Sequence, residues 1–475
     1  MTLIRMQTGI SGLDEILHGG LMKAGVYLVR GEPGSGKTIF ANQICFCRAA
    51  TGAKVSYVTL LAESHGRMLE HLAPFSFYRE DAIPSEIYYV SAFHALTDGG
   101  LVGVTTFLQS EVRTRNVELL VLDGLVSVSD AASSGQELKL FVAELQAYSA
   151  LMGCTILLLN SVGVGDKVTP EQTMVDGIFR LRHELSGARH ERSLEVVKFR
   201  GSSVVGGTHT LRFSDDGIAI YPRLEACQSA DSSKIGPVPR GPALATGVPG
   251  LDELSEARGY PQASVTALSG APGTGKTLLG LHFLGLATPE ERALHFGFYE
   301  SPALLIEVAT NFGIDLETLR RAGTLEFIWQ PYGALHLDEL SQRLLSAVKR
   351  AQCKRVFIDG FGGFLSTPAF EERSTAFLGA LCNELRRLGA TTLIAVETQD
   401  PNAFVLPMPT HGISGVADNV VRLRTEETQG VVRRRLSLGK VRGSRIETAL
   451  RELKLTGAGL RVVDDATNDD DLAED

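Results

Sequence analysis

The chain has 475 residues, of which 46 are basic and 55 acidic, so its formal net charge is −9. With 44% hydrophobic and 21% charged residues, the composition excludes disorder over most of the chain, because there is enough apolar surface to offset the entropy of ordering. This length predicts about two to four domains.

Targeting segments and membrane spans are not expected. No apolar run approaches the ~18 residues that cross a bilayer, and residues 1–9 lack the hydrophobic region of a signal peptide. The cysteines are few and scattered, at positions 45, 47, 154, 227, 353 and 382. We therefore expect a cytoplasmic protein with reduced thiols and no membrane partner, rather than a disulfide framework or a zinc site.

The negative charge is concentrated at the end of the chain. Residues 464–475 hold seven acids and no base, and without them the balance changes from −9 to −2. We expect this acidic tail to be disordered. The remainder is near neutral and has no strongly basic segment, which argues against a nucleic-acid partner.

Strands and helices are predicted to alternate. In chain order, the first half shows a strand at 24–30, a helix at 39–50, strands at 54–60 and 119–122, a helix at 137–151 and a strand at 155–159. Nearly continuous apolar strands separated by helices indicate an α/β fold, with a mostly parallel sheet covered by helices on both faces. Segments 194–200 and 208–213 alternate in polarity instead, which predicts antiparallel strands at the sheet edge.

The same pattern returns about 240 residues later. Five landmarks recur in order: Thr-Gly-x-x-Gly-Leu-Asp at 8–14 and 246–252, a glycine loop at 31–38 and 270–277, aspartates at 123 and 359, related segments at 175–182 and 417–424, and Lys-x-Arg-Gly-Ser at 198–202 and 440–444. This is a duplicated domain rather than a solenoid, whose periods are far shorter. We expect domains at 1–222 and 246–463, a proline- and serine-rich linker at 223–245, and the tail at 464–475.

The two glycine loops match the pattern GxxxxGK[ST], in which the backbone wraps closely around a phosphate and the following helix directs its amides at the anion. A plain glycine turn is the alternative, but two matches in register within a duplicated domain make coincidence negligible. The expected nucleotide-binding residues are Gly31, Gly34, Ser35, Gly36, Lys37 and Thr38 in the first copy, and Gly270, Gly273, Thr274, Gly275, Lys276 and Thr277 in the second. The lysines would reach the β- and γ-phosphates, and Thr38 and Thr277 would bind Mg²⁺.

Asp123 and Asp359 each end a short apolar run. An aspartate at the carboxyl end of a strand can hold the Mg²⁺ shell, although it can also cap the next turn. The position of both, about 85 residues after a glycine loop, favours the metal role.

Glu63 and Glu300 each follow a predicted strand and precede a serine. A carboxylate at this place could orient or deprotonate an attacking water. The alternative is an acid at a helix N-terminus. Because the two positions are equivalent in the repeats, we favour catalysis.

Two Lys-x-Arg pairs, Lys198 with Arg200 and Lys440 with Arg442, lie at alternating positions of predicted strands, so each pair shares one face. Such a pair could stabilise a γ-phosphate across a subunit boundary, as an arginine finger does. Spacing alone favours the alternative, a solvated strand face.

Together these features resemble the KaiC family of RecA-like ATPases, the circadian-clock and clock-like proteins. The resemblance spans residues 6–220 and 244–460, and its most specific elements are the double-domain arrangement, the repeated Lys-x-Arg-Gly-Ser and the Asp-Asn-Val-Val-Arg-Leu at 418–423. It implies tandem RecA-like P-loop domains, ATP with Mg²⁺, slow ATP hydrolysis, and a homohexamer of two stacked rings with ATP at the subunit interfaces. It also implies that the four Lys-x-Arg side chains contact ATP bound by a neighbouring subunit, and that a KaiB-like or signalling protein is a partner.

The sequence departs from the clock members at two places. Those members have two adjacent glutamates per half, whereas here Ala62 precedes Glu63 and Tyr299 precedes Glu300. Their Ser-Thr phosphorylation pair falls on Ser414 and Gly415, so only the serine is present. Our first hypothesis is an ATPase that acts as an oligomeric switch. The alternatives are a protein kinase acting on its own Ser414 and a RecA-like nucleic-acid ATPase, against which the near-neutral charge counts.

Overall fold

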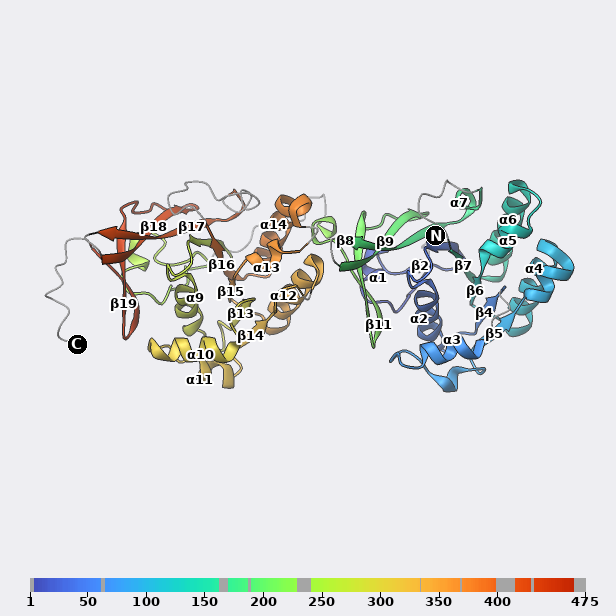
Figure 1. Ribbon diagram of the computed structural model, residues 1–475, viewed down its shortest axis with the longest axis horizontal. Coiled ribbons are helices and arrows are strands. Elements are labelled where there is room, and N and C mark those ends of the chain that lie inside the picture. The colour runs from blue at the N-terminus through green and yellow to red at the C-terminus, as the bar shows by residue number, and fades with distance from the viewer. Residues whose placement is uncertain are drawn as a thin grey trace. The chain divides into compact units, whose positions relative to one another are not determined.

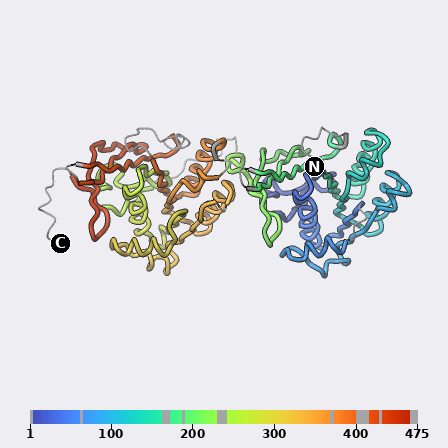
Figure 2. Tube along the Cα trace, in the orientation of Figure 1, coloured from blue at the N-terminus to red at the C-terminus, as the bar shows by residue number. Residues whose placement is uncertain are grey.

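The computed structural model describes residues 4–60, 65–161, 170–186, 189–228, 241–333, 335–367, 370–398, 415–428 and 431–464. The chain divides into two compact units, Met1–Cys227 and Gln228–Asp475. Figure 2 traces each unit as one continuous stretch of chain, from blue to green in the first and from green to red in the second.

The first unit is built on a nine-stranded sheet (Figure 1). In sheet order its strands are β11 (Gly217–Tyr221), β10 (Thr208–Ser214), β9 (Arg189–Phe199), β8 (Gly177–Ser186), β3 (Val26–Gly31), β7 (Thr155–Ser161), β6 (Leu119–Asp123), β4 (Val55–Thr59) and β5 (Ile87–Ser91). The strands from β8 to β5 are parallel, and β8 to β11 pair antiparallel. A separate short pair joins β1 (Arg5–Met6) and β2 (Leu21–Met22).

Helices cover both faces of this sheet because its central strands are apolar on both sides. In β3, Tyr27 and Val29 pack into a core with α2 residues, whereas Val26 and Leu28 pack into a second core with residues of α4 and α6. Figure 1 shows α2 on one side of the strands and α4 to α6 on the other. The helices are α1 (Leu13–Ile16), α2 (Lys37–Ala49), α3 (His65–Leu72), α4 (Phe93–Arg115), α5 (Leu125–Ala131), α6 (Gly135–Met152), α7 (Pro170–Met174) and α8 (Leu224–Cys227), with a 3₁₀ turn at Glu80–Ala82.

The second unit repeats this topology strand for strand. Its sheet order is β20 (Gly459–Val463), β19 (Arg451–Thr456), β18 (Val431–Val441), β17 (Asn419–Thr428), β12 (Val265–Gly270), β16 (Thr391–Glu397), β15 (Arg355–Asp359), β13 (Ala293–Gly297) and β14 (Leu325–Trp329). Its helices are α9 (Lys276–Gly285), α10 (Pro302–Asn311), α11 (Leu316–Arg321), α12 (Leu337–Ala351), α13 (Gly362–Leu365) and α14 (Phe370–Arg387), with a 3₁₀ turn at Asp252–Leu254.

The predicted fold class is confirmed. Both sheets are mostly parallel and lie between helices, and both are extended by antiparallel strands at one edge. The predicted linker 223–245 contains α8 and a bridge between Leu244 and Tyr260, and its residues 229–240 lie outside the described residues, as does the tail from 465 onward.

None of the helices that the structure describes has both the length and the apolar character needed to cross a membrane.

Candidate functional site

The first glycine loop connects β3 to α2. Gly34 and Gly36 have φ values of 78° and 100°, in the left-handed region that favours glycine, so the loop closes tightly before the helix begins at Lys37. The Nζ of Lys37 donates hydrogen bonds to the carbonyl oxygens of Gly31 (2.8 Å) and Glu32 (2.9 Å). The ammonium group is thus folded over the loop, where a phosphate cradled by the loop amides would lie.

The second glycine loop, between β12 and α9, has the same geometry. Gly273 and Gly275 have φ values of 78° and 102°. The Nζ of Lys276 donates to the carbonyl oxygens of Gly270 and Ala271, both at 2.8 Å. The two halves therefore carry equivalent phosphate cradles.

Asp123 lies at the carboxyl end of β6, at the same sheet edge as the first loop. The hydroxyl of Tyr57 donates a 2.7 Å hydrogen bond to its Oδ2. Burial raises the pKa of Asp123, while the Tyr57 hydrogen bond and the Lys37 charge act in the opposite direction. Burial lowers the pKa of Lys37, because it disfavours the charged ammonium form, and the charge of Asp123 partly offsets that shift. The charges of Lys37 and Asp123 therefore each shift the pKa of the other group.

Asp359 occupies the equivalent position at the end of β15. The Oγ1 of Thr277 donates to its Oδ1 at 3.3 Å, and the Nε2 of His295 lies 3.7 Å from its Oδ2. His295 is equivalent to Tyr57, because each lies two residues before the strand residue that pairs with the aspartate. Unlike Tyr57, His295 makes no hydrogen bond to the carboxylate, and the buried Oδ2 of Asp359 has no hydrogen-bond partner among the residues that the structure describes.

These residues fit a Mg²⁺ ion. Each pocket supplies the hydroxyl of its loop threonine and a strand-end aspartate, and Mg²⁺ takes oxygen ligands, usually from one or two protein groups together with waters and substrate phosphates. The Oδ2 of Asp359, which has no partner within the described ranges, is a buried acceptor of the kind that a cation satisfies. Within the part of the chain that the structure describes, no group of three or more His, Cys, Asp or Glu side chains could hold a metal.

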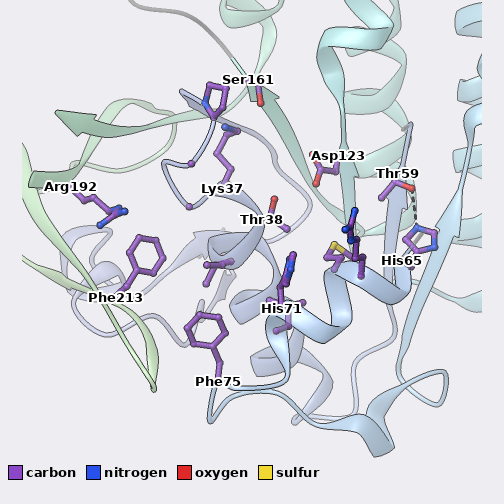
Figure 3. Close-up of a pocket in the computed structure, with 17 residues that line it drawn as sticks. Lys37, Thr38, Thr59, His65, His71, Phe75, Asp123, Ser161, Arg192 and Phe213 are labelled. Carbon is purple, nitrogen blue, oxygen red and sulfur yellow. Dashed lines mark hydrogen bonds between the residues drawn. The ribbon is translucent and has the colours of Figure 1, made fainter. Parts of the chain in front are cut away.

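The first cradle opens into a pocket of about 670 Å³ (Figure 3). Lys37, Thr38 and Asp123 line its polar part, and Phe75 and Phe213 line an apolar part beside the loop. Phe213 packs so close to the loop that a Cβ on Gly36 would lie 2.3 Å from its ring. The pocket thus combines a phosphate cradle with an apolar compartment, which suits a nucleotide.

The second pocket, of about 450 Å³, holds the predicted Glu300 together with Lys276 and Asp359. Burial raises the pKa of Glu300, and the charge of Asp359 adds to that shift. A carboxylate with a raised pKa beside the phosphate site has the property of a general base. The predicted equivalent in the first half, Glu63, lies outside the described residues, as does Ser414.

The Lys-x-Arg pair of the first half donates hydrogen bonds to backbone carbonyl oxygens and does not line the pocket of that half. The Nζ of Lys198 donates to Gln172 (3.2 Å) and Thr173 (3.0 Å). The guanidinium of Arg200 donates to Thr173 (3.2 Å) and Met174 (3.3 Å). Both side chains therefore hold the end of α7, just before β8.

The second pair is placed alike. Lys440 donates to the carbonyl of Ala417 at 2.8 Å, and Arg442 forms an ion pair with Asp418 at 3.2 Å. None of the four side chains is among the described residues that line the pocket of its own half. The structure brings together the lysine, threonine and aspartate of each cradle, and in the second half Glu300, but not the Lys-x-Arg pairs.

Sequence alone did not single out Tyr57, His295 or Glu397. Tyr57 and His295 contact the aspartates from the neighbouring strand, and no local motif marks them. Glu397, which lines the second pocket, ends β16. Its signal was present, because it closes the apolar run Leu-Ile-Ala-Val in the same way as Asp359 closes its own.

Comparison with known proteins agrees with this geometry. The family model described as "ATPase: KaiC" matches residues 6–225 and 244–467, one match on each repeat. Over 98% of its length the chain is 25% identical to the circadian clock oscillator protein KaiC of Prochlorococcus marinus (strain MIT 9313), of which 94% is covered. The chain is also 25% identical to KaiC of Synechococcus elongatus and 27% identical to KaiC 1 of Synechocystis, with 98% of this chain and 90% of each relative covered. With both repeats matched and both phosphate cradles in place, this chain belongs to the KaiC family of ATPases.

Proposed function

We propose that this protein is a Mg²⁺-dependent ATPase that assembles into a nucleotide-dependent hexameric double ring and acts as a regulatory switch. The observation that supports ATPase activity is that a loop lysine, a threonine and a strand-end aspartate lie in one pocket in each half of the chain. The KaiC relatives are named as clock oscillator proteins, which supports a regulatory role for this chain.

Nucleotide binding follows from the cradles. The loop amides and the N-terminus of α2 or α9 would hold the β- and γ-phosphates. Lys37 or Lys276 would exchange its loop carbonyls for phosphate oxygens. Thr38 with Asp123, and Thr277 with Asp359, would hold Mg²⁺, which when bound neutralises charge on the β- and γ-phosphates.

Hydrolysis in the second half would use Glu300 as the base. Its carboxylate accepts a proton from a water whose oxygen attacks the γ-phosphorus, and the bond from that phosphorus to the bridging oxygen breaks to give ADP and inorganic phosphate. The raised pKa makes the Glu300 carboxylate a stronger base than an ordinary glutamate. We assign the same role in the first half to Glu63, from its sequence position.

The hexamer would complete each site. Because the Lys-x-Arg side chains do not line their own pockets, we propose that Arg200 and Arg442, with Lys198 and Lys440, serve the nucleotide of a neighbouring subunit. Nucleotide bound at an interface stabilises the assembled state by mass action. Occupancy of the sites would then control the surface offered to a KaiB-like or signalling partner.

Native mass spectrometry with parallel ATPase assays tests this proposal. With ATP and Mg²⁺ we expect hexamers that carry two nucleotides per subunit and release phosphate. A monomer at saturating ATP would contradict the ring, and nucleotide binding without phosphate release would contradict the ATPase. Phosphate attached to Ser414 in the same spectra would support the autokinase hypothesis instead.

A further inference from the structure

The two pockets differ at the strand beside each glycine loop. In the first half β7 ends at Ser161, which pairs in register with Gly31. In the second half β16 ends at Glu397, which pairs in register with Gly270. Ser161 and Glu397 therefore occupy the same position of the repeat, and one is neutral where the other is acidic.

Glu397 faces the phosphate cradle. It lines the second pocket with Lys276, Thr277 and Asp359, and its register partner Gly270 is the residue whose carbonyl accepts the 2.8 Å hydrogen bond from Lys276. Ser161 lines the first pocket together with Lys37 (Figure 3). The register thus places the residue at this position beside the lysine that would meet the γ-phosphate.

The electrostatic surroundings of the two lysines reflect this difference. Burial lowers the pKa of Lys276, and the carboxylates of Glu397 and Asp359 oppose that shift, with Glu397 the stronger of the two. For Lys37 the described acid that opposes burial is Asp123. Among the residues that the structure describes, the second cradle therefore has one more carboxylate acting on its lysine than the first.

Resting on the proposed nucleotide binding, we infer that Glu397 sets a lower affinity for nucleoside triphosphate in the second half than in the first, and makes that affinity depend more strongly on a divalent cation. The carboxylate repels the γ-phosphate, and a bound cation reduces the repulsion because it neutralises phosphate charge. ADP lacks the γ-phosphate and is repelled less. The nucleotide sites of the two halves are then occupied at different concentrations of ATP.

Reciprocal exchange of the two residues in the full-length chain tests this inference. Lys37→Ala isolates binding to the second half, and Lys276→Ala isolates the first. The probe is the non-hydrolysable analogue AMPPNP, titrated calorimetrically with EDTA and with Mg²⁺, and ADP is titrated in parallel. Because Glu397 is exposed and screened by water, we expect Glu397→Gln and Glu397→Ser to tighten AMPPNP binding in EDTA by roughly three- to tenfold. The gain should be smaller with Mg²⁺ and smaller for ADP.

The first half supplies the opposite exchange. Ser161→Glu should weaken AMPPNP binding by a similar factor, and Ser161→Gln, which has nearly the same volume without the charge, should not. Glu290→Gln removes a charge from an exposed loop outside the second pocket and should leave the affinity unchanged.

Three outcomes would overturn the inference: unchanged or weaker AMPPNP binding in Glu397→Gln, an equal change for ADP and AMPPNP, or equal weakening by Ser161→Glu and Ser161→Gln. Absence of nucleotide binding in both the Lys37→Ala and the Lys276→Ala chains that keep Ser161 and Glu397 would instead contradict the proposed function. The two failures are therefore distinguishable.

Discussion

Tyr57 and His295 occupy the same position of the two repeats, but only Tyr57 hydrogen-bonds the aspartate beside it. The Tyr57 hydroxyl lies 2.7 Å from Oδ2 of Asp123, whereas Nε2 of His295 lies 3.7 Å from Oδ2 of Asp359. The first aspartate thus accepts a hydrogen bond from its neighbouring strand, and the second keeps an acceptor with no partner in the described part of the chain. The two halves differ both here and at Ser161 and Glu397, which argues that their sites are not redundant.

Tyr57→Phe should destabilise the first half and impair its metal site. Loss of one hydrogen bond to a partly buried carboxylate costs about 1–3 kcal/mol of unfolding free energy, which urea denaturation measures. Because the Tyr57 hydrogen bond lowers the pKa of Asp123, its removal raises that pKa further. Mg²⁺ binds the ionised carboxylate, so on acidification Mg²⁺-dependent nucleotide binding should be lost at a higher pH than in the unaltered chain.

The control for this prediction is the second half of the same protein. In a Lys37→Ala chain, Tyr57→Phe should leave Mg²⁺-dependent binding at the second loop unchanged, since Tyr57 contacts only groups of the first unit among the residues described. An unchanged acid limit of binding in the first half would contradict the role of Tyr57.

Glu300→Gln should keep nucleotide bound while reducing turnover in the second half. The amide has the shape of the carboxylate but cannot accept the proton, and a general base contributes about 10²- to 10⁴-fold to the rate. Phosphate release is measured in the Glu63→Gln chain, which is expected to keep nucleotide in the first half and so to keep the assembly, and ADP affinity is the control for an intact cradle. Glu63→Gln is expected to act alike in the Lys276→Ala chain. Turnover that persists in the Glu63→Gln/Glu300→Gln double variant would refute both assignments.

Local sequence predicts the parts of the site that lie within one motif. The glycine loops, their lysines and the strand-end aspartates were predicted because each is marked by a contiguous pattern, and the structure places them in common pockets. Tyr57 and His295 were missed because their importance depends on which strands are neighbours, and strand order is set by packing. Glu397 ends an apolar run as the two aspartates do, but its place beside the glycine loop depends on the pairing of β16 with β12.

Lys37→Ala and Lys276→Ala should weaken assembly unequally. Ligand that binds only the assembled state stabilises it by about 2.7 kcal/mol at a hundred times its dissociation constant, so loss of nucleotide affinity shifts the equilibrium toward monomers. We expect the larger effect from Lys37→Ala, since the first half is inferred above to bind nucleoside triphosphate more tightly than the second. Native mass spectra across an ATP titration measure this, with Lys139→Ala, an exposed lysine of α6, as the control. Equal hexamer fractions for all three variants would contradict nucleotide-driven assembly.

Arg200 and Arg442 should act on the nucleotide of a neighbouring subunit. Each arginine lies next to an aspartate, 3.8 Å from Asp176 and 3.2 Å from Asp418 respectively, and outside the pocket of its own half. An arginine that reaches a γ-phosphate in trans is a charge-assisted donor, whose removal costs about 10³-fold or more in rate. Arg200→Ala should therefore abolish most turnover of the first half while its own loop still binds nucleotide.

Mixed rings distinguish this trans contact from a structural role. Arg200→Ala subunits keep an intact loop, and Lys37→Ala subunits keep an intact arginine, so a ring that contains both has interfaces where the two meet. Both chains carry Lys276→Ala, so that the second half is silent. We expect the mixture to hydrolyse ATP faster than either variant alone, in proportion to the fraction of such interfaces seen by native mass spectrometry. If rings verified as mixed show no gain, the arginine and the loop act within one subunit and the trans assignment fails. If Arg200→Ala alone retains full turnover, Arg200 has only a structural role, through its hydrogen bonds to the carbonyl oxygens of Thr173 and Met174.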